Sequence, residues 1–149
     1  MRAEETCYMQ HTLAKPFSCL GVGLHSGYVV TMIVTPSGPN TGYTFVRRDV
    51  EKKCNVIKAH WHNVHDAKLS TNLINSQGVK IQSVEHLLAA LSAHGIDNAR
   101  ILIDGPEVPS MDGSARPFSD LILSVGKVEQ TALRKVMLIK KVVQVCEGD

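Results

Sequence analysis

The most informative short segment of the sequence is Ser83-Val84-Glu85-His86-Leu87, which sets a carboxylate beside an imidazole. The pair lies within a segment that carries an apolar stripe at helical spacing, comprising Val84, Leu87, Leu88 and Leu91. On such a helix Glu85 and His86 lie about 100° apart, and both lie off the stripe. A neutral imidazole nitrogen is a good metal ligand, and a neighbouring carboxylate can take a proton from water. The alternative is a pair of solvated surface side chains.

Two further segments carry polar residues in glycine-rich surroundings. Asp112 and Ser114 lie in the run MDGSA at 111–115, where they either serve a site or cap the helix predicted to follow. His25 stands between Gly23 and Gly27, in a predicted turn that exposes its side chain. An incidental surface histidine is the alternative there.

A fourth segment, at 60–66, contains His60, His62 and His65 followed by Asp66. On a strand, the His-x-His spacing places two imidazoles on one face, and these residue types suit zinc. A different metalloprotein that uses these histidines is therefore one hypothesis. A polar loop that carries three histidines by chance is the other.

The elements that position these residues follow from periodicity and punctuation. A helix is predicted over 84–94, with Ser83 as its N-cap and Gly95 as its stop. A second helix has Pro117 in its first turn and ends at Gly126. Strands are predicted over 12–20, 28–35, 43–47, 54–59, 69–75, 79–82, 99–104 and 136–145, with a polar link at 126–133. The break at 75–78 predicts a hairpin between two of these strands.

Two one-sided helices and several half-alternating strands predict an α+β fold. We expect a two-layer sandwich, a mostly antiparallel sheet with both helices on one face. The net charge of +2 is too small to indicate a nucleic-acid partner, and no apolar run is long enough to span a membrane. The four cysteines are scattered, which favours a reducing cytoplasm over a disulfide-bonded protein.

Four segments together and in order resemble the family of UDP-3-O-acyl-N-acetylglucosamine deacetylases. They are GVGLHSG at 21–27, SVEHLLAAL at 83–91, GIDN at 95–98 and MDGSA at 111–115. The run QHTL at 10–13 resembles the opening strand of the family, so the similarity extends from about residue 10 to the end. The resemblance implies a fold like the second domain of ribosomal protein S5.

The resemblance also implies an activity and a set of roles. These hydrolases use zinc to remove the N-acetyl group from a UDP-linked, 3-O-acylated glucosamine, in the lipid A and lipopolysaccharide synthesis of Gram-negative bacteria. It implies that Glu85 is the general base and that His86 is a zinc ligand. The stretch Leu69, Ser70 and Thr71 would border the active site. His25 and Asp112 would support it.

The family has two similar domains, and the resemblance places the other zinc ligands in the second. We expect a leader at 1–11, a first deacetylase domain at 12–127, and at 128–149 a linker with the first strand of a truncated second domain. The zinc site would then be incomplete and the chain inactive by itself. A non-catalytic binding or scaffold remnant, or half of a split enzyme, are the alternatives.

Overall fold

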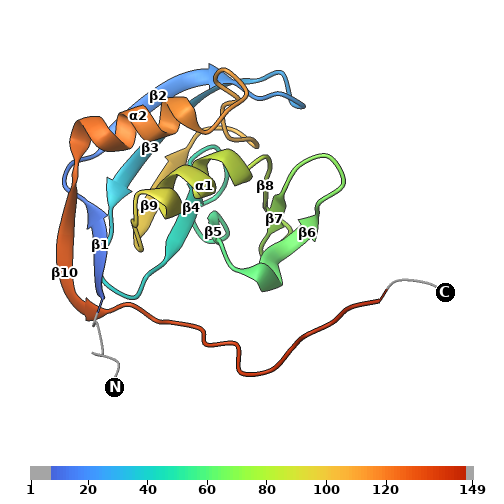
Figure 1. Ribbon diagram of the computed structural model, residues 1–149. Coiled ribbons are helices and arrows are strands. Elements are labelled where there is room, and N and C mark those ends of the chain that lie inside the picture. Colours follow the sequence, from blue (N-terminus) through green and yellow to red (C-terminus); the bar gives the residue numbers. More distant parts are fainter. Residues whose placement is uncertain (1–7, 147–149) are drawn as a thin grey trace, which may run out of the picture.

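The computed structural model describes residues 8–146, and its centre is a five-stranded sheet in the order β2-β3-β9-β4-β5 (Figure 1). Its strands are β2 (Phe17–Val22), β3 (Val29–Pro36), β9 (Ala99–Ile103), β4 (Tyr43–Arg47) and β5 (Val56–Lys58). All neighbouring pairs are antiparallel except β4 and β9, which run parallel. The β-branched and aliphatic residues of these strands alternate between a buried and an exposed face.

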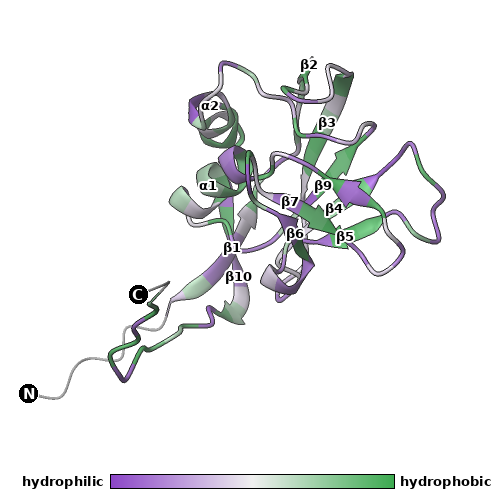
Figure 2. Cartoon of the chain, turned by 90° about the vertical axis from the view of Figure 1, so that its right-hand side faces the viewer, coloured by the Kyte–Doolittle hydropathy of each residue, from purple (hydrophilic) through white to green (hydrophobic). Residues whose placement is uncertain are grey.

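Both helices lie on one face of this sheet (Figure 1). They are α1 (Glu85–Ala93) and α2 (Arg116–Val125), and they pack against each other. Leu87 and Leu91 of α1 are buried, as are Phe118 and Ile122 of α2. They share one apolar core with the buried residues of the sheet, whose strand β3 is mainly hydrophobic in Figure 2. The predicted two-layer α+β sandwich is confirmed.

The helix ends follow the prediction at the C-termini but not at the N-termini. Gly95 and Gly126 adopt φ values of 68° and 73° just after the helices, as expected of stop residues. Ser83 is not an N-cap: Val84 holds that position, and α1 has no side-chain cap. Ser83 itself adopts φ 56°, and its hydroxyl bonds elsewhere. The α2 N-cap is Ala115, although the Ser114 hydroxyl accepts the Arg116 N–H at 3.1 Å.

A small three-stranded sheet lies beside the sandwich and has the order β6-β7-β8. Its strands are β6 (Val64–Asp66), β7 (Asn72–Ile74) and β8 (Lys80–Ile81), and a 3-10 turn, η1 (Trp61–Asn63), precedes it. The hairpin predicted around 75–78 is confirmed, with the Asn75 side chain accepting the N–H groups of Gln77 and Val79. Strand β6 was not predicted, because its three residues are all exposed and show no apolar alternation.

Two strand predictions near the ends of the chain are wrong. The single strand expected over 12–20 is two strands, β1 (Met9–Leu13) and β2, which are separated around Pro16. The strand expected over 136–145 is absent, whereas the expected link forms β10 (Lys127–Leu133) and pairs antiparallel with β1. The apolar segment after β10 has the right composition but no strand partner among residues 8–146, and it extends away from the sandwich (Figure 1). The division into domains stays a prediction.

No helix within residues 8–146 combines the length and the apolar character that crossing a membrane requires.

Candidate functional site

Glu85 and His86 form the start of helix α1 and face away from the core. Val84 and Leu87, on either side of them in the sequence, are fully buried, whereas Glu85 and His86 are only half-buried. The apolar stripe therefore anchors the first turn and turns the two polar side chains outward. The predicted orientation of this pair is confirmed.

The pair opens into a cavity of about 420 Å³. Its polar lining comprises His25, Ser70, Ser83, Glu85, His86, Ser110 and Asp112, and its apolar lining includes Leu24, Leu69, Val108, Pro109 and Met111. Residues separated by up to 89 positions in the sequence thus meet in one place. Six of the seven residues that the resemblance singled out line this cavity, and the seventh, Thr71, donates its backbone N–H to one of them, Glu85. We call it the Glu85–His86 pocket.

The Glu85 carboxylate is oriented by one backbone group. The Thr71 N–H donates to it at 2.9 Å, and the Val84 N–H donates back to the Thr71 carbonyl at 3.2 Å. Its place in the first turn of α1 also favours a negative charge, because the helix dipole is positive there. Within residues 8–146 the imidazole of His86 makes no hydrogen bond, so it is available to a ligand.

His25 is presented by a tight turn between β2 and β3. The Gly27 N–H donates to the Gly23 carbonyl at 2.9 Å, and Gly27 has φ 69°, which favours glycine. Position 23 also requires glycine, because a Cβ atom there would lie 2.5 Å from a carboxylate oxygen of Glu107. The turn leaves the His25 side chain exposed, as predicted.

Asp112 also lines the pocket, and its side chain is exposed. The hydroxyl and the N–H of Ser114 both donate to its carboxylate, at 2.8 and 2.9 Å. These hydrogen bonds from Ser114 hold the pKa of Asp112 below its ordinary value, so the side chain is an anion at neutral pH. Asp112 therefore orders the loop before α2 and sets a negative charge at the rim.

Glu107 is a residue of this region that the sequence analysis missed. Its side chain is fully buried beneath the pocket, where it accepts hydrogen bonds from His25, Ser26 and Ser83. Burial acts to raise the pKa of Glu107, but the hydrogen bonds from Ser26, Ser83 and His25 outweigh it, and the pKa is lowered. The available signal was a lone carboxylate within the otherwise apolar run from Pro106 to Pro109.

The three histidines at 60–66 do not converge on a metal site. His60 precedes the 3-10 turn η1 and His62 lies within it, with ring centroids 4.8 Å apart. His65 lies on the exposed strand β6. Within residues 8–146, no three His, Cys, Asp or Glu side chains form a group that can hold a metal ion. The same finding applies to the Glu85–His86 pocket, where His86 fits as a single imidazole donor but lacks the partners of a three-ligand zinc site.

Comparison with known proteins gives the pocket a context. Residues 10–149 match the family of UDP-3-O-acyl N-acetylglycosamine deacetylases. The chain belongs to this family. Its relatives named UDP-3-O-acyl-N-acetylglucosamine deacetylase include proteins of Myxococcus xanthus (49% identical over 142 residues) and Haemophilus influenzae (48% over 140 residues). A third, from Shewanella oneidensis, is 45% identical over 140 residues.

These matches cover nearly all of the chain but only part of each relative. They include 94 to 95% of this chain and 45 to 46% of the relatives. The chain thus spans a little under half the length of the curated relatives that it matches. All the residues of the Glu85–His86 pocket lie within the matched range.

Proposed function

We propose that the Glu85–His86 pocket is one half of the active site of a zinc-dependent UDP-3-O-acyl-N-acetylglucosamine deacetylase. The observation that carries this proposal is the convergence of Glu85 and His86 with His25, Ser70 and Asp112 in one cavity. Family membership supports the reaction, the hydrolysis of an N-acetyl amide to acetate and a free amine. The product would enter lipid A synthesis.

In this proposal Glu85 is the general base. A water molecule attacks the carbonyl carbon of the acetamide, and Glu85 accepts the proton that the water loses. The bond between the carbonyl carbon and nitrogen then breaks, and the same proton passes from Glu85 to the departing amine. The single hydrogen bond from the Thr71 N–H supports this role, because it orients the carboxylate and leaves lone pairs free for water.

His86 is the residue of this chain that would hold zinc, through a neutral ring nitrogen. A zinc ion, when bound, supplies Lewis-acid polarisation of the carbonyl. Because residues 8–146 contain no group of three suitable ligands, we propose that the other donors come from the part of the family's length that this chain does not match. Residues 12–127 would then form a first deacetylase domain, and residues 128–149 would lead into a second.

Two exposed leucines at the pocket support the proposal that another part of the protein completes the site. Leu24 and Leu69 stand at the opening with 71% and 85% of their surface exposed. Large apolar side chains so exposed beside a polar pocket are typical of a surface that another group covers. We propose that the acyl chain of the substrate, or the part of the family's length that this chain does not match, covers these two leucines.

The test is acetate release by a polypeptide that joins these residues to the remaining length of the family. Glu85→Gln keeps the size of the side chain and removes the base, so we expect kcat to fall by about 10² to 10⁴. Glu51→Gln is the matched control, since Glu51 is exposed and its carboxylate forms an ion pair with the exposed Lys53 at 2.8 Å. It should keep the wild-type rate. A Glu85→Gln protein as active as the control would contradict the proposal.

A further inference from the structure

Glu107 is a fully buried carboxylate whose partners are all neutral hydrogen-bond donors. The His25 N–H lies 3.1 Å from each of its oxygens, the Ser26 N–H lies 2.7 Å from Oε2, and the Ser83 hydroxyl lies 2.7 Å from Oε1. No Lys, Arg or His side chain forms an ion pair with it within residues 8–146. A buried anion is costly unless it is fully hydrogen-bonded, so these donors must stay in place.

The segment that carries Glu107 is fixed between two other elements. The Gln82 N–H donates to the Pro106 carbonyl at 2.9 Å, and the Val108 N–H donates to the Gln82 carbonyl at 3.0 Å. Two residues further on, the Ser110 N–H donates to the Val22 carbonyl at the end of β2. The backbone at 106–110 therefore joins the segment before α1 to the strand before the His25 turn, and Glu107 lies where the two meet.

A hydrogen-bonded chain also connects Glu107, through Ser83 and Asn72, to Ser70. The Ser83 N–H donates to Asn72 Oδ1 at 3.3 Å, and the Ser70 hydroxyl donates to the same oxygen at 3.0 Å. One carboxylate thus links the His25 turn, the residues that enter α1, and the stretch around Ser70. Each of these three segments contributes a side chain to the pocket.

An ionised carboxylate is the group that this position requires. All of its partners donate, and a carboxylate only accepts, whereas the amide of glutamine would turn an NH₂ group toward one of the donors. Its oxygens also occupy the space that a Cβ atom at Gly23 would need. Ser83 adopts φ 56°, an unfavourable conformation for a serine, and its hydrogen bond to Glu107 stabilises it there.

We infer that Glu107 is a positioning residue for the proposed deacetylase, which holds the His25 turn and the entry to α1 together so that His25, Glu85 and His86 face one pocket. The catalytic meaning of this inference rests on the proposed function. Glu107 itself touches no reacting atom, because it lies below the residues that line the cavity. The geometric claim can be tested without any turnover.

The test compares Glu107→Gln with wild type by amide hydrogen exchange and by imidazole NMR spectra of the 149-residue chain. Loss of a charge-assisted hydrogen bond predicts about ten- to hundredfold faster exchange of the His25 and Ser26 amides. The imidazole signals of both His25 and His86 should shift at constant pH. Asp104→Asn is the control, because the Asp104 carboxylate likewise accepts a backbone N–H, that of Thr31 at 2.7 Å, but Asp104 does not line the pocket. Its effects should stay near Thr31.

Two results would overturn the inference. One is unchanged exchange at His25 and Ser26 in Glu107→Gln. The other is a uniform increase at all amides with unchanged imidazole signals, which would mean that Glu107 contributes only to global stability. If Glu107→Gln does not fold, Ser83→Ala removes the hydrogen bond from the Ser83 hydroxyl to Glu107 and should shift the His86 signals. Unshifted signals in that variant would also contradict the inference. A failed acetate-release test with intact positioning would instead count against the proposed function alone.

Discussion

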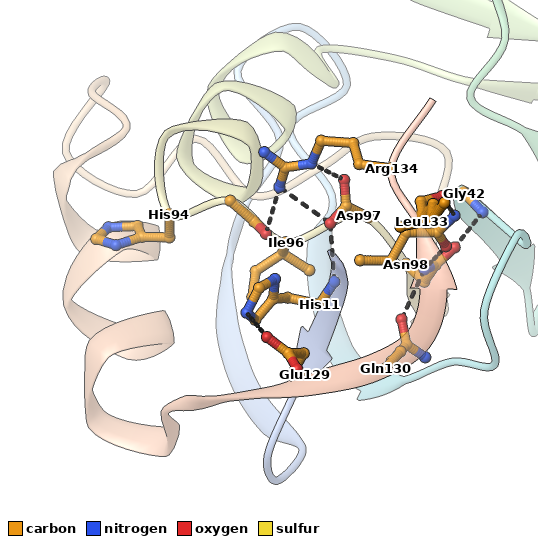
Figure 3. A network of polar contacts seen from close by, with 12 residues as sticks. His11, Gly42, His94, Ile96, Asp97, Asn98, Glu129, Gln130, Leu133 and Arg134 are labelled. Atoms are coloured by element: carbon orange, nitrogen blue, oxygen red, sulfur yellow. Dashed lines mark hydrogen bonds and ion pairs between the residues drawn. The ribbon is translucent and has the colours of Figure 1, made fainter. Parts of the chain in front are cut away.

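The two ends of helix α1 use polar residues in opposite ways. After its C-terminus, Asn98 is 1% exposed and every polar atom of its side chain is hydrogen-bonded (Figure 3). Its partners are the side chains of Gln10 and Gln130 and the N–H groups of Thr41 and Gly42, at 2.7 to 2.9 Å. At the N-terminus, Glu85 accepts one backbone hydrogen bond, and the His86 ring has no partner within residues 8–146.

Asp97 behaves as Asn98 does, although it is less buried. Its carboxylate pairs with Arg134 at 2.7 and 3.0 Å and accepts the His11 N–H at 2.8 Å (Figure 3). A cavity of about 370 Å³ lies beside this network, but the polar side chains Asp97, Asn98 and Arg134 on its wall are bonded to the protein itself. The comparison teaches that a segment typical of the family need not be a reactive one. Unused hydrogen-bonding capacity therefore distinguishes Glu85 and His86 from Asp97 and Asn98.

The largest effect that would sharpen this comparison is on stability. Asn98→Ala removes the partner of the Gly42 and Thr41 N–H groups and of the Gln130 side-chain oxygen, whereas Gln10 Oε1 keeps the Asn40 N–H, so we expect the free energy of unfolding to fall by about 2 to 4 kcal/mol. Glu85→Gln is the counterpart at the other end of α1. It should cost less than about 1 kcal/mol, because the glutamine oxygen can still accept the Thr71 N–H. Urea denaturation of both variants measures the difference. Equal decreases in the free energy of unfolding would contradict the distinction between the two ends of α1.

A smaller effect concerns the pH dependence of stability near the pocket. The pKa of Glu107 in the folded chain lies below its ordinary value of 4.5, so the unfolded chain binds more protons as the solution becomes acidic. The stabilisation by ionised Glu107 is therefore fully present above about pH 4.5 and is lost as the pH falls through the folded pKa. The stability difference between wild type and Glu107→Gln should shrink between pH 7 and pH 3. A difference that stays constant across this range would contradict the assignment of a lowered pKa.

Periodicity in the sequence was sufficient to predict both helices and the sandwich, because each element buries one continuous apolar face. Periodicity did not predict which segment near the C-terminus forms a strand, because that depends on the strand with which the segment pairs. Residues 136–145 have a strand composition, but the polar segment Lys127–Leu133 is the one that pairs with β1. Composition describes what a segment can do, and only the tertiary structure shows which edge is available to it.

Some residues of the candidate site can likewise be recognised from their local sequence, and others cannot. For Glu85, His86, His25 and Asp112, neighbouring glycines and an apolar stripe indicate how the side chains are presented, but only the resemblance to the family gives them roles in a site. Glu107 was not predicted, since its role depends on donors from residues more than 20 positions away. The local sequence around Ser83 fits a helix cap, yet Val84 holds the N-cap position. The nearby buried carboxylate draws the Ser83 hydroxyl away from that role.

We propose that this chain supplies the base and, among residues 8–146, a single metal ligand of a deacetylase site. The most direct test is incubation of the 149-residue chain with zinc and UDP-3-O-acyl-N-acetylglucosamine, with circular dichroism to establish that the sample is folded. We predict no release of acetate, because His86 lacks companion ligands among residues 8–146. Acetate release that disappears in Glu85→Gln would contradict the claim, since the chain would then assemble a complete site by itself.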